Sequence, residues 1–339
     1  MMKMERNTIF RLYSMSKPVC AVAVWILIER KLLALDDRLE DILEEFHNMS
    51  VYRKDREEPA QHPVKIRDLL NMTAGFTYDD NDAAGQKTGE IFTEIHRAED
   101  EGRDISTREV ARMIARQPLA FEPGERWRYG LCADILGAVI EEVAGCRLSD
   151  FYQKEIFEPL GMTDTGFYVP EEKQDRFAPL FERVEKDGVC ILTYDRDHHL
   201  GLGDFLAPPA FESAGAGLVS TMDDYMKFAW MLACGGEGNG KRILKRETVE
   251  QFGENQLTES QKTSVYFEYL KGYGYGNLMR VCLDEEAAVP GIKHAFGWDG
   301  WCGPYMMVDG RHKRALVFFL QIAGYTDWNL NSQILRLFI

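Results

Sequence analysis

The stretch RLYSMSKPVCAVAVWILIERK, from Arg11 to Lys31, places two serines and a lysine directly ahead of a nearly unbroken apolar run. This run is apolar on almost every face, a pattern typical of a helix that is buried all round. Pro18 fits the first turn of such a helix, because its missing N–H needs no partner there. We therefore expect residues 17–31 to form a helix in the centre of the protein.

The same run has to be weighed as a secretion signal. Its ten apolar residues, Val19 to Ile28, match the apolar part of a signal peptide and are too short to span a bilayer. The leader before them is long and mixed in charge, no small-x-small cleavage site follows, and the chain continues as folded protein. We therefore expect a cytoplasmic protein.

The composition limits the classes of partner. With 339 residues, 45% of them hydrophobic, the chain can bury a large core in one domain or in two closely packed ones. A formal net charge of −15 repels phosphate backbones and anionic membranes, so we expect neither as a partner.

Seven scattered cysteines form no C-x-x-C pair, which indicates free thiols in a reducing compartment. No motif for a metal or a nucleotide is present, so we expect no metal and no cofactor.

The apolar pattern changes along the chain. Up to about residue 236 it indicates mostly helices, and residues 167–211 within this part are expected to be loops or short strands. After residue 236, short β-rich runs between Gly, Asp and basic turns predict an antiparallel meander. The sequence thus predicts an α/β (α+β) fold, with an antiparallel sheet flanked by helices and a mostly helical subdomain. Helices are expected at 35–46, 106–121, 133–145, 148–162 and 220–236, with a short closing helix at the C-terminus.

Ser14-Met15-Ser16-Lys17 fits the motif S-x-x-K. A lysine three residues after a serine lies on the same face of a helix, one turn away. If it is buried, such a lysine loses its charge easily and can take the proton of the serine. The alternative is that Ser14 caps the helix and Lys17 extends to solvent, and this stretch alone does not separate the two interpretations.

Two further sites can carry chemistry. Tyr129, in RWRYGLCADILG, lies at a turn before an expected helix, and a functional role would need a partner for its phenolate, such as Lys17. The alternative is a half-buried aromatic side chain. Trp298-Asp299-Gly300 lies in a glycine-rich turn ahead of a strand, where glycine allows a backbone to approach a substrate closely. The alternative there is a plain hairpin turn.

Taken in order, these sites resemble the serine β-lactamase and penicillin-binding-protein superfamily, and most closely the class C β-lactamase-related branch that includes family VIII carboxylesterases. That family carries S-x-x-K, then a tyrosine in a Y-x-N-like motif, then K-T-G, H-x-G or W-x-G on a strand. The resemblance implies a β-lactamase/transpeptidase-like fold, which we expect as a single domain over 1–339, mostly helical over about 31–225 and containing the sheet in 1–30 and 226–339. Similar flanks are FRLYSMSKPV, IRDLLNMTAGF, LAFEPGERWRYG, IFEPLGMTDTGF, SAGAGLVSTMDDYMKFAWML and FGWDGWCGPYMMVD.

The resemblance also implies a mechanism. Ser14 would be the nucleophile that forms an acyl-enzyme, and Lys17 and Tyr129 would share the general-base work. The backbone N–H groups of Ser14 and Trp301 would form the oxyanion hole, with Gly300 beside them in the substrate-binding turn. Trp298 would stand where lactamases carry a lysine.

Two departures from the family pattern favour one substrate class. Leu131 occupies the position of the Asn in Y-x-N, and Trp298 removes the cation that would pair with a β-lactam carboxylate. Both changes favour a small neutral ester over a β-lactam or a D-alanyl peptide, and W-x-G is itself a mark of the esterase branch. The alternatives are β-lactamase or D-alanyl-D-alanine peptidase activity on an amide, or a non-catalytic relative that binds a ligand in the same cleft.

The third departure concerns the beginning of the chain. Family members usually carry a helix and two strands before S-x-x-K, whereas thirteen residues precede Ser14 here. We therefore expect either a truncated start or another element in the place of those strands. An open sheet edge would invite pairing between copies of the chain, so a homo-oligomer is compatible with the sequence.

Overall fold

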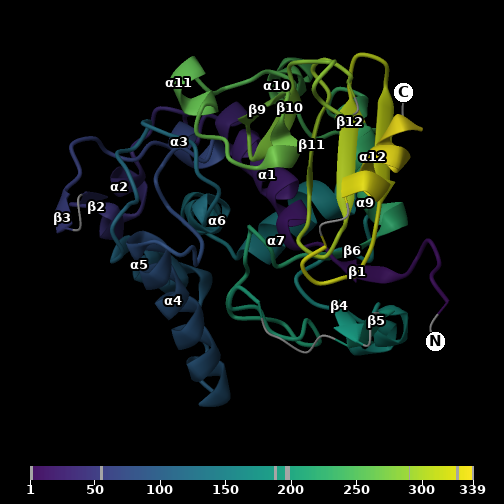
Figure 1. Ribbon diagram of the computed structural model, residues 1–339, viewed down its shortest axis with the longest axis horizontal. Coiled ribbons are helices and arrows are strands. Elements are labelled where there is room, and N and C mark those ends of the chain that lie inside the picture. The colour runs from purple at the N-terminus through teal and green to yellow at the C-terminus, as the bar shows by residue number, and fades with distance from the viewer. Residues whose placement is uncertain are drawn as a thin grey trace.

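Helix α1 (Ser16–Glu29) runs through the middle of the molecule (Figure 1). The computed structural model describes residues 3–53, 56–186, 189–194, 199–289, 291–325 and 328–337. Every side chain of α1 from Ser16 to Val24 is buried, because the run offers no polar face to water. The prediction of a central, buried helix is confirmed, with Trp25 and Ile28 only partly buried, and the helix ends two residues before the expected Lys31.

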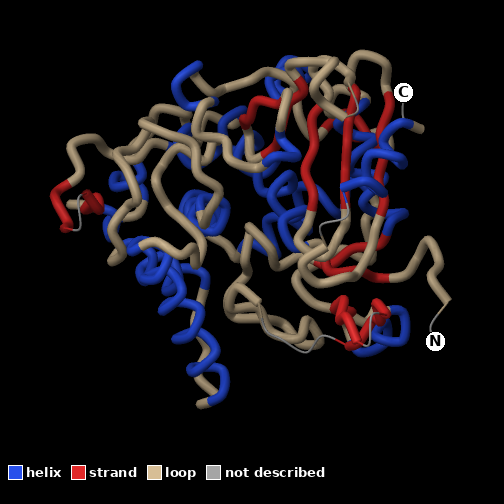
Figure 2. Tube along the Cα trace, viewed as in Figure 1, coloured by secondary structure: helices blue, strands red, loops and turns tan. Residues whose placement is uncertain are grey.

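Five antiparallel strands form the main sheet, in the order β13-β12-β11-β10-β9. Neighbours in the sheet are also neighbours in the sequence, so the sheet is the meander that the β-rich runs predict. Figure 2 shows these strands side by side with helices against them. The strands are β9 (Tyr273–Gly276), β10 (Met279–Cys282), β11 (Phe296–Asp299), β12 (Tyr305–Asp309) and β13 (Arg314–Phe318).

Helices pack around this sheet in layers. Helix α9 (Met222–Ala233) packs against β12 and β13. Helix α12 (Trp328–Arg336) follows the last strand of the sheet in the sequence. Helix α1 contacts β11 and also α6 (Cys132–Ala144), so it lies between the sheet and the helical region. The first turn of α1 is therefore held where these two parts of the molecule meet.

The helical region begins after α1, and α4 (Ala83–Asp100) projects from it (Figure 1). The single helix expected over 35–46 is wrong: Leu43 is extended there, which separates α2 from the short turn η2 (Glu44–Phe46). The helix expected over 148–162 is α7, a π-helical turn η3 (Gln153–Phe157) and α8 in succession. The remaining helices are α2 (Leu39–Ile42), α3 (Ile66–Leu70), α4 (Ala83–Asp100), α5 (Thr107–Ala115), α7 (Leu148–Tyr152), α8 (Glu158–Leu160), α10 (Arg246–Phe252) and α11 (Glu259–Lys262).

The sequence signals at several helix ends are visible in the structure. Ser106 and Glu109 form a capping box at the start of α5. Thr221 caps α9 by accepting a hydrogen bond from a backbone N–H, and Gly145 ends α6 in the left-handed conformation. Helix α6 thus begins just after Tyr129, and its position fixes that turn.

Four small antiparallel pairs complete the fold. Strand β1 (Ile9–Arg11), which leads directly into Ser14, pairs with β6 (Val219–Thr221) and lies outside the five-stranded sheet. The pair β4–β5 lies in the segment expected to hold loops or short strands. The other pairs are β2 (Ser50–Arg53) with β3 (Arg56–Pro59), β4 (Phe181–Lys186) with β5 (Val189–Tyr194), and β7 (Glu237–Gly238) with β8 (Lys241–Arg242).

Two findings bear on the expectations about thiols and membranes. The cysteines whose side chains are described are free thiols, and four of them are buried. Among the described helices, none combines the length and apolar character that a bilayer crossing requires.

Candidate active site

Ser14 and Lys17 lie at the junction between a short 3₁₀ turn η1 (Tyr13–Met15) and α1. The cap residue of α1 is Met15, and no side chain caps the helix, so the interpretation of Ser14 as a helix cap is wrong. Lys17 is fully buried and does not reach solvent. Its Nζ lies 3.1 Å from Ser14 Oγ, as the S-x-x-K spacing predicts.

The ammonium group of Lys17 has three oxygen acceptors. Nζ donates to Ser14 Oγ at 3.1 Å, to the Tyr78 hydroxyl at 3.0 Å and to the backbone oxygen of Gly215 at 2.9 Å. All three N–H groups of a charged lysine are therefore satisfied. Burial nevertheless disfavours the charge and lowers the pKa of Lys17 to about 8, against the opposing effect of Asp134.

Asp134, in the first turn of α6, contacts Gly215, one of the three hydrogen-bond acceptors of Lys17. Its Oδ1 accepts hydrogen bonds from Ser213 Oγ at 2.6 Å and from the backbone N–H of Gly215 at 3.1 Å. Burial raises the pKa of Asp134, while the charge of Lys17 and these two donors oppose the rise. The carboxylate thus holds Gly215, the residue whose carbonyl binds Lys17.

Tyr129 lies beside the same serine and lysine. Its hydroxyl accepts a hydrogen bond from Trp298 Nε1 at 2.9 Å, and its side chain also hydrogen-bonds with Ser14. Lys17 Nζ lies 4.8 Å from the centre of the Tyr129 ring, and it donates to Ser14, Tyr78 and Gly215. Burial raises the pKa of Tyr129, and the hydrogen bonds from Ser14 and Trp298 oppose this. Trp298 thus donates a hydrogen bond to the Tyr129 hydroxyl, and stabilisation of a Tyr129 phenolate by Lys17 stays a prediction.

The turn after β11 closes against the backbone that precedes Ser14. A Cβ on Gly300 would lie 2.2 Å from the backbone oxygen of Leu12, so a larger residue could not approach so closely. The ring of the next residue, Trp301, packs 5.1 Å from the ring of Tyr13. Tyr13 has a positive φ of 45°, a strained conformation for a tyrosine next to a candidate nucleophile. No protein acceptor in the described chain takes the backbone N–H of Trp301.

Aromatic side chains make up much of the surroundings of Tyr129. Leu131, at the position of the family's Asn, is 3% exposed and packs in the hydrophobic core, and its role in substrate binding stays a prediction. The nearby cation Arg280 is also buried, and its Nη2 lies 2.5 Å from Asp299 Oδ1. Ring centres within 5.3–6.3 Å of the Tyr129 ring belong to Tyr78, Trp127, Phe267 and Trp298.

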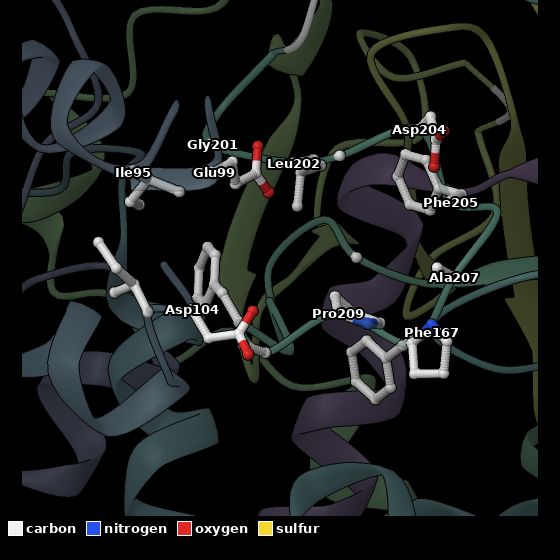
Figure 3. A pocket seen from close by; sticks show the side chains of 16 residues that line it. Ile95, Glu99, Asp104, Phe167, Gly201, Leu202, Asp204, Phe205, Ala207 and Pro209 are labelled. Carbon is white, nitrogen blue, oxygen red and sulfur yellow. The ribbon is translucent and has the colours of Figure 1, made fainter. Parts of the chain in front are cut away.

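A cavity of about 180 Å³ opens between α4 and the segment 201–211 (Figure 3). Figure 3 shows Ile95 and Glu99 of α4 on one side and Phe205 and Phe167 on the other. Phe205 also packs 6.5 Å from the ring of Tyr13, but Ser14 does not line this cavity. The cavity therefore adjoins the candidate site without containing its chemistry.

The structure brings most of the predicted residues to one place and adds others. Ser14, Lys17, Tyr129 and Trp298 are linked by hydrogen bonds, and the turn Gly300–Trp301 closes against the same segment. The sequence interpretation missed Tyr78, Asp134 and Gly215. Asp134 lies five residues after Tyr129, on the expected helix, so its first-turn carboxylate could have been noticed. Tyr78 and Gly215 carry no motif, and only the fold brings them to Lys17.

The chain is similar to several known proteins along most of its length. The Beta-lactamase family model matches residues 1–336. An uncharacterized protein of Mycobacterium tuberculosis is 31% identical over 331 residues, which cover 94% of this chain and 78% of that protein. Esterase EstB of Burkholderia gladioli is 30% identical over 319 residues, which cover 90% of this chain and 75% of EstB. The solved structure of EstCE1, a hydrolase with promiscuous acyltransferase activity, matches with a TM-score of 0.77 and 28% identity over 98% of this chain and 85% of EstCE1.

These similarities extend along nearly the whole chain and include its first and last helices. They confirm the resemblance that S-x-x-K, the tyrosine and W-x-G indicate, and with it the expected fold. The chain belongs to the Beta-lactamase family.

Proposed function

We propose that this chain is a serine hydrolase that cleaves small neutral esters through an acyl-enzyme on Ser14. The observation that carries the proposal is the contact of 3.1 Å between Ser14 Oγ and Nζ of the fully buried Lys17. Its similarity to EstB and EstCE1, which are an esterase and a hydrolase by name, supports the same reaction class. The substrate is a small molecule, because Ser14 lies half-buried between the sheet and the helical region.

The first step transfers the Ser14 proton to Lys17. With the pKa of Lys17 lowered to about 8, a useful fraction of the amine is neutral near pH 8. A neutral amine has two N–H donors and one lone pair, and the Gly215 carbonyl can only accept. The lone pair must therefore face the hydroxyl of Ser14 or of Tyr78. A Tyr78 hydroxyl that donates or accepts keeps Lys17 hydrogen-bonded in both of its protonation states.

The second step is attack on the ester carbonyl. Ser14 Oγ bonds to the carbonyl carbon, and the backbone N–H groups of Ser14 and Trp301 stabilise the negative charge that forms on the carbonyl oxygen. Losing one such donor costs about 3 kcal/mol in related sites. Tyr129 hydrogen-bonds with Ser14 and is therefore placed to pass a proton to the leaving alcohol as its C–O bond breaks. The Trp298 N–H stabilises Tyr129 while that proton is away. Water then attacks the acyl group and gives a proton to Tyr129, while Lys17 returns its proton to Ser14 as the bond to Oγ breaks.

The surroundings favour a neutral substrate. Trp298 stands where a cation would pair with a substrate carboxylate, and the nearby Arg280 already pairs with Asp299. A carboxylate that entered this site would lose water without gaining a cationic partner, which is costly. Aromatic rings around Tyr129 instead offer apolar contact to an ester. This argument disfavours β-lactams and D-alanyl peptides as substrates.

The test compares two serines of one segment. Ser14→Ala should abolish hydrolysis of p-nitrophenyl acetate and labelling by a fluorophosphonate probe. Ser16→Ala is the matched control, because Ser16 is buried and its Oγ accepts a hydrogen bond from the Leu218 N–H. It should keep both activities. Equal hydrolysis by wild type and Ser14→Ala would refute the assignment of the nucleophile.

Two other outcomes would replace the proposal. Labelling of Ser14 by a fluorescent penicillin, with faster turnover of a β-lactam than of the ester, would identify a β-lactamase or peptidase. Folded wild-type protein that reacts with neither the ester nor the fluorophosphonate would be a non-catalytic relative that binds a ligand in this cleft.

A further inference from the structure

The buried carboxylate of Asp134 is in contact with Gly215, the residue whose carbonyl binds Lys17. It is 5% exposed and accepts from Ser213 Oγ at 2.6 Å and from the Gly215 N–H at 3.1 Å. A Cβ on Gly215 would lie 2.6 Å from Asp134 Oδ2, so the carboxylate is pressed against this residue. Gly215 therefore has to lack a side chain for Asp134 to reach it.

One residue, Gly215, connects Asp134 to Lys17 through the two peptide groups on either side of its Cα. The N–H of Gly215 is held by Asp134, and its carbonyl accepts from Lys17 Nζ at 2.9 Å. The charge of Lys17 acts on Asp134 and favours its ionised form. Asp134 also lies in the first turn of α6, a helix of 13 residues whose positive N-terminal end favours an ionised carboxylate.

We propose that Asp134 is a positioning residue that holds Gly215 against Lys17 and balances the charge Lys17 gains when Ser14 gives up its proton. This inference rests on the proposed function, because it concerns the same proton transfer. In that step the O–H bond of Ser14 breaks, an N–H bond forms on Lys17, and the electron pair left on Oγ attacks the ester carbonyl. Asp134 exchanges no proton and keeps its negative charge throughout.

The other groups around Lys17 do not supply this charge. Burial raises the pKa of the Cys20 and Cys132 thiols to about 12, so both are neutral near pH 8. It also raises the pKa of Tyr78 and Tyr129 above the usual range of a phenol. The carboxylate of Asp299 faces Lys17 too, but it already pairs with the cation Arg280. Asp134 therefore contributes more negative charge at Lys17 than these groups do.

The experiment separates charge from hydrogen bonding. Asp134→Asn keeps an oxygen that accepts from Ser213 and Gly215 but removes the charge. The rate kcat/KM for p-nitrophenyl acetate should rise with pH as Lys17 becomes neutral. Without the carboxylate, the charged lysine is less stable, so the midpoint of that rise should fall by about 1 pH unit. Ser213→Ala is the matched control: it removes a hydrogen bond to Asp134, keeps the charge, and should leave the midpoint in place while lowering the Tm.

The outcomes distinguish this inference from the proposed function. A wild-type protein without Ser14-dependent labelling by the fluorophosphonate would refute the proposed function itself. An Asp134→Asn protein that labels at Ser14, with the wild-type midpoint, would overturn the role of Asp134 alone. If Asp134→Asn does not fold, Asp134→Ser carries the same expectation, because its hydroxyl can accept from Gly215 without charge. A midpoint shift of equal size in Ser213→Ala would also overturn the inference.

Discussion

Lys17 and Arg280 are both buried cations; Lys17 lies near the ring of Tyr129 and Arg280 near the ring of Trp298, and these two rings are in contact. Lys17 is fully buried and Arg280 is 2% exposed. Lys17 meets three uncharged oxygens, on Ser14, Tyr78 and Gly215. Arg280 meets the carboxylate of Asp299 at 2.5 Å and the faces of Trp298 and Tyr305, with ring centres 5.2 and 4.8 Å away.

The partners decide what each cation can do. Burial lowers the pKa of Lys17 to about 8, because uncharged acceptors compensate its charge only in part. For Arg280, Tyr305 and Asp299 outweigh burial and raise the pKa further. A guanidinium does not lose its proton in proteins, whereas a buried amine does. We therefore infer that Lys17 serves as a proton acceptor and Arg280 as a fixed structural charge.

The largest expected effect is the loss of acylation in Lys17→Met. The substitution keeps an unbranched apolar side chain, one atom shorter than that of lysine, but removes the proton acceptor of Ser14. General bases contribute about 10²–10⁴-fold, so we expect labelling by the fluorophosphonate and hydrolysis of p-nitrophenyl acetate to fall about 10³-fold. A Lys17→Met protein that acylates at more than a tenth of the wild-type rate would end the comparison, because Lys17 would then be a structural charge like Arg280.

Lys17→Met also tests the lowered pKa through stability. The pKa of Lys17 falls from 10.5 in its ordinary state to about 8 in the folded protein. Between these values the unfolded chain binds more protons than the folded one, so the wild type should gain stability as pH rises from 8 to 10.5. The gain is about 3 kcal/mol for a shift of this size. Urea unfolding of wild type and Lys17→Met at both pH values measures it, since the variant lacks this titration.

The second effect is a loss of stability in Arg280→Met. The substitution leaves Asp299 buried without its cation, and breaking a buried ion pair in this way costs about 3–5 kcal/mol. The free energy of unfolding from urea titration at pH 7 measures the loss. The matched control is the double variant Arg280→Met with Asp299→Asn, which removes both charges and should recover part of it. A folded Arg280→Met protein should still be labelled at Ser14, in contrast to Lys17→Met.

The sequence predicts some of these features because they are local. The unbroken apolar run predicts the burial of α1, and the spacing of three residues predicts that Lys17 lies beside Ser14. The turn at Gly300 follows from a glycine where two backbones meet. The direction of the lysine ammonium could not be predicted, because Tyr78 and Gly215 reach it from loops far away in the sequence. For the same reason the hydrogen bond from Trp298 to Tyr129 could not be predicted.

The segment 35–46 shows that apolar periodicity does not always predict the backbone conformation. Its apolar residues recur at helical spacing, but Leu43 adopts an extended conformation and Leu39 begins only a short helix. Both leucines are buried in the core, so tertiary packing is satisfied without a continuous helix. Periodicity identified the residues that face the core but not the backbone that carries them.

The smallest expected effect concerns Tyr78, one of the three hydrogen-bond partners of Lys17. Tyr78→Phe removes one of three acceptors and leaves the ring in place against Tyr129. Since one hydrogen bond contributes about 1 kcal/mol net, we expect kcat/KM for p-nitrophenyl acetate to fall about tenfold or less. Tyr168→Phe, at a partly exposed tyrosine, is the matched control and should leave the rate unchanged. If Tyr78→Phe loses as much activity as Lys17→Met, the hydroxyl of Tyr78 takes part in the proton transfer itself. Lys17 would then be, like Arg280, a charge that positions its neighbours.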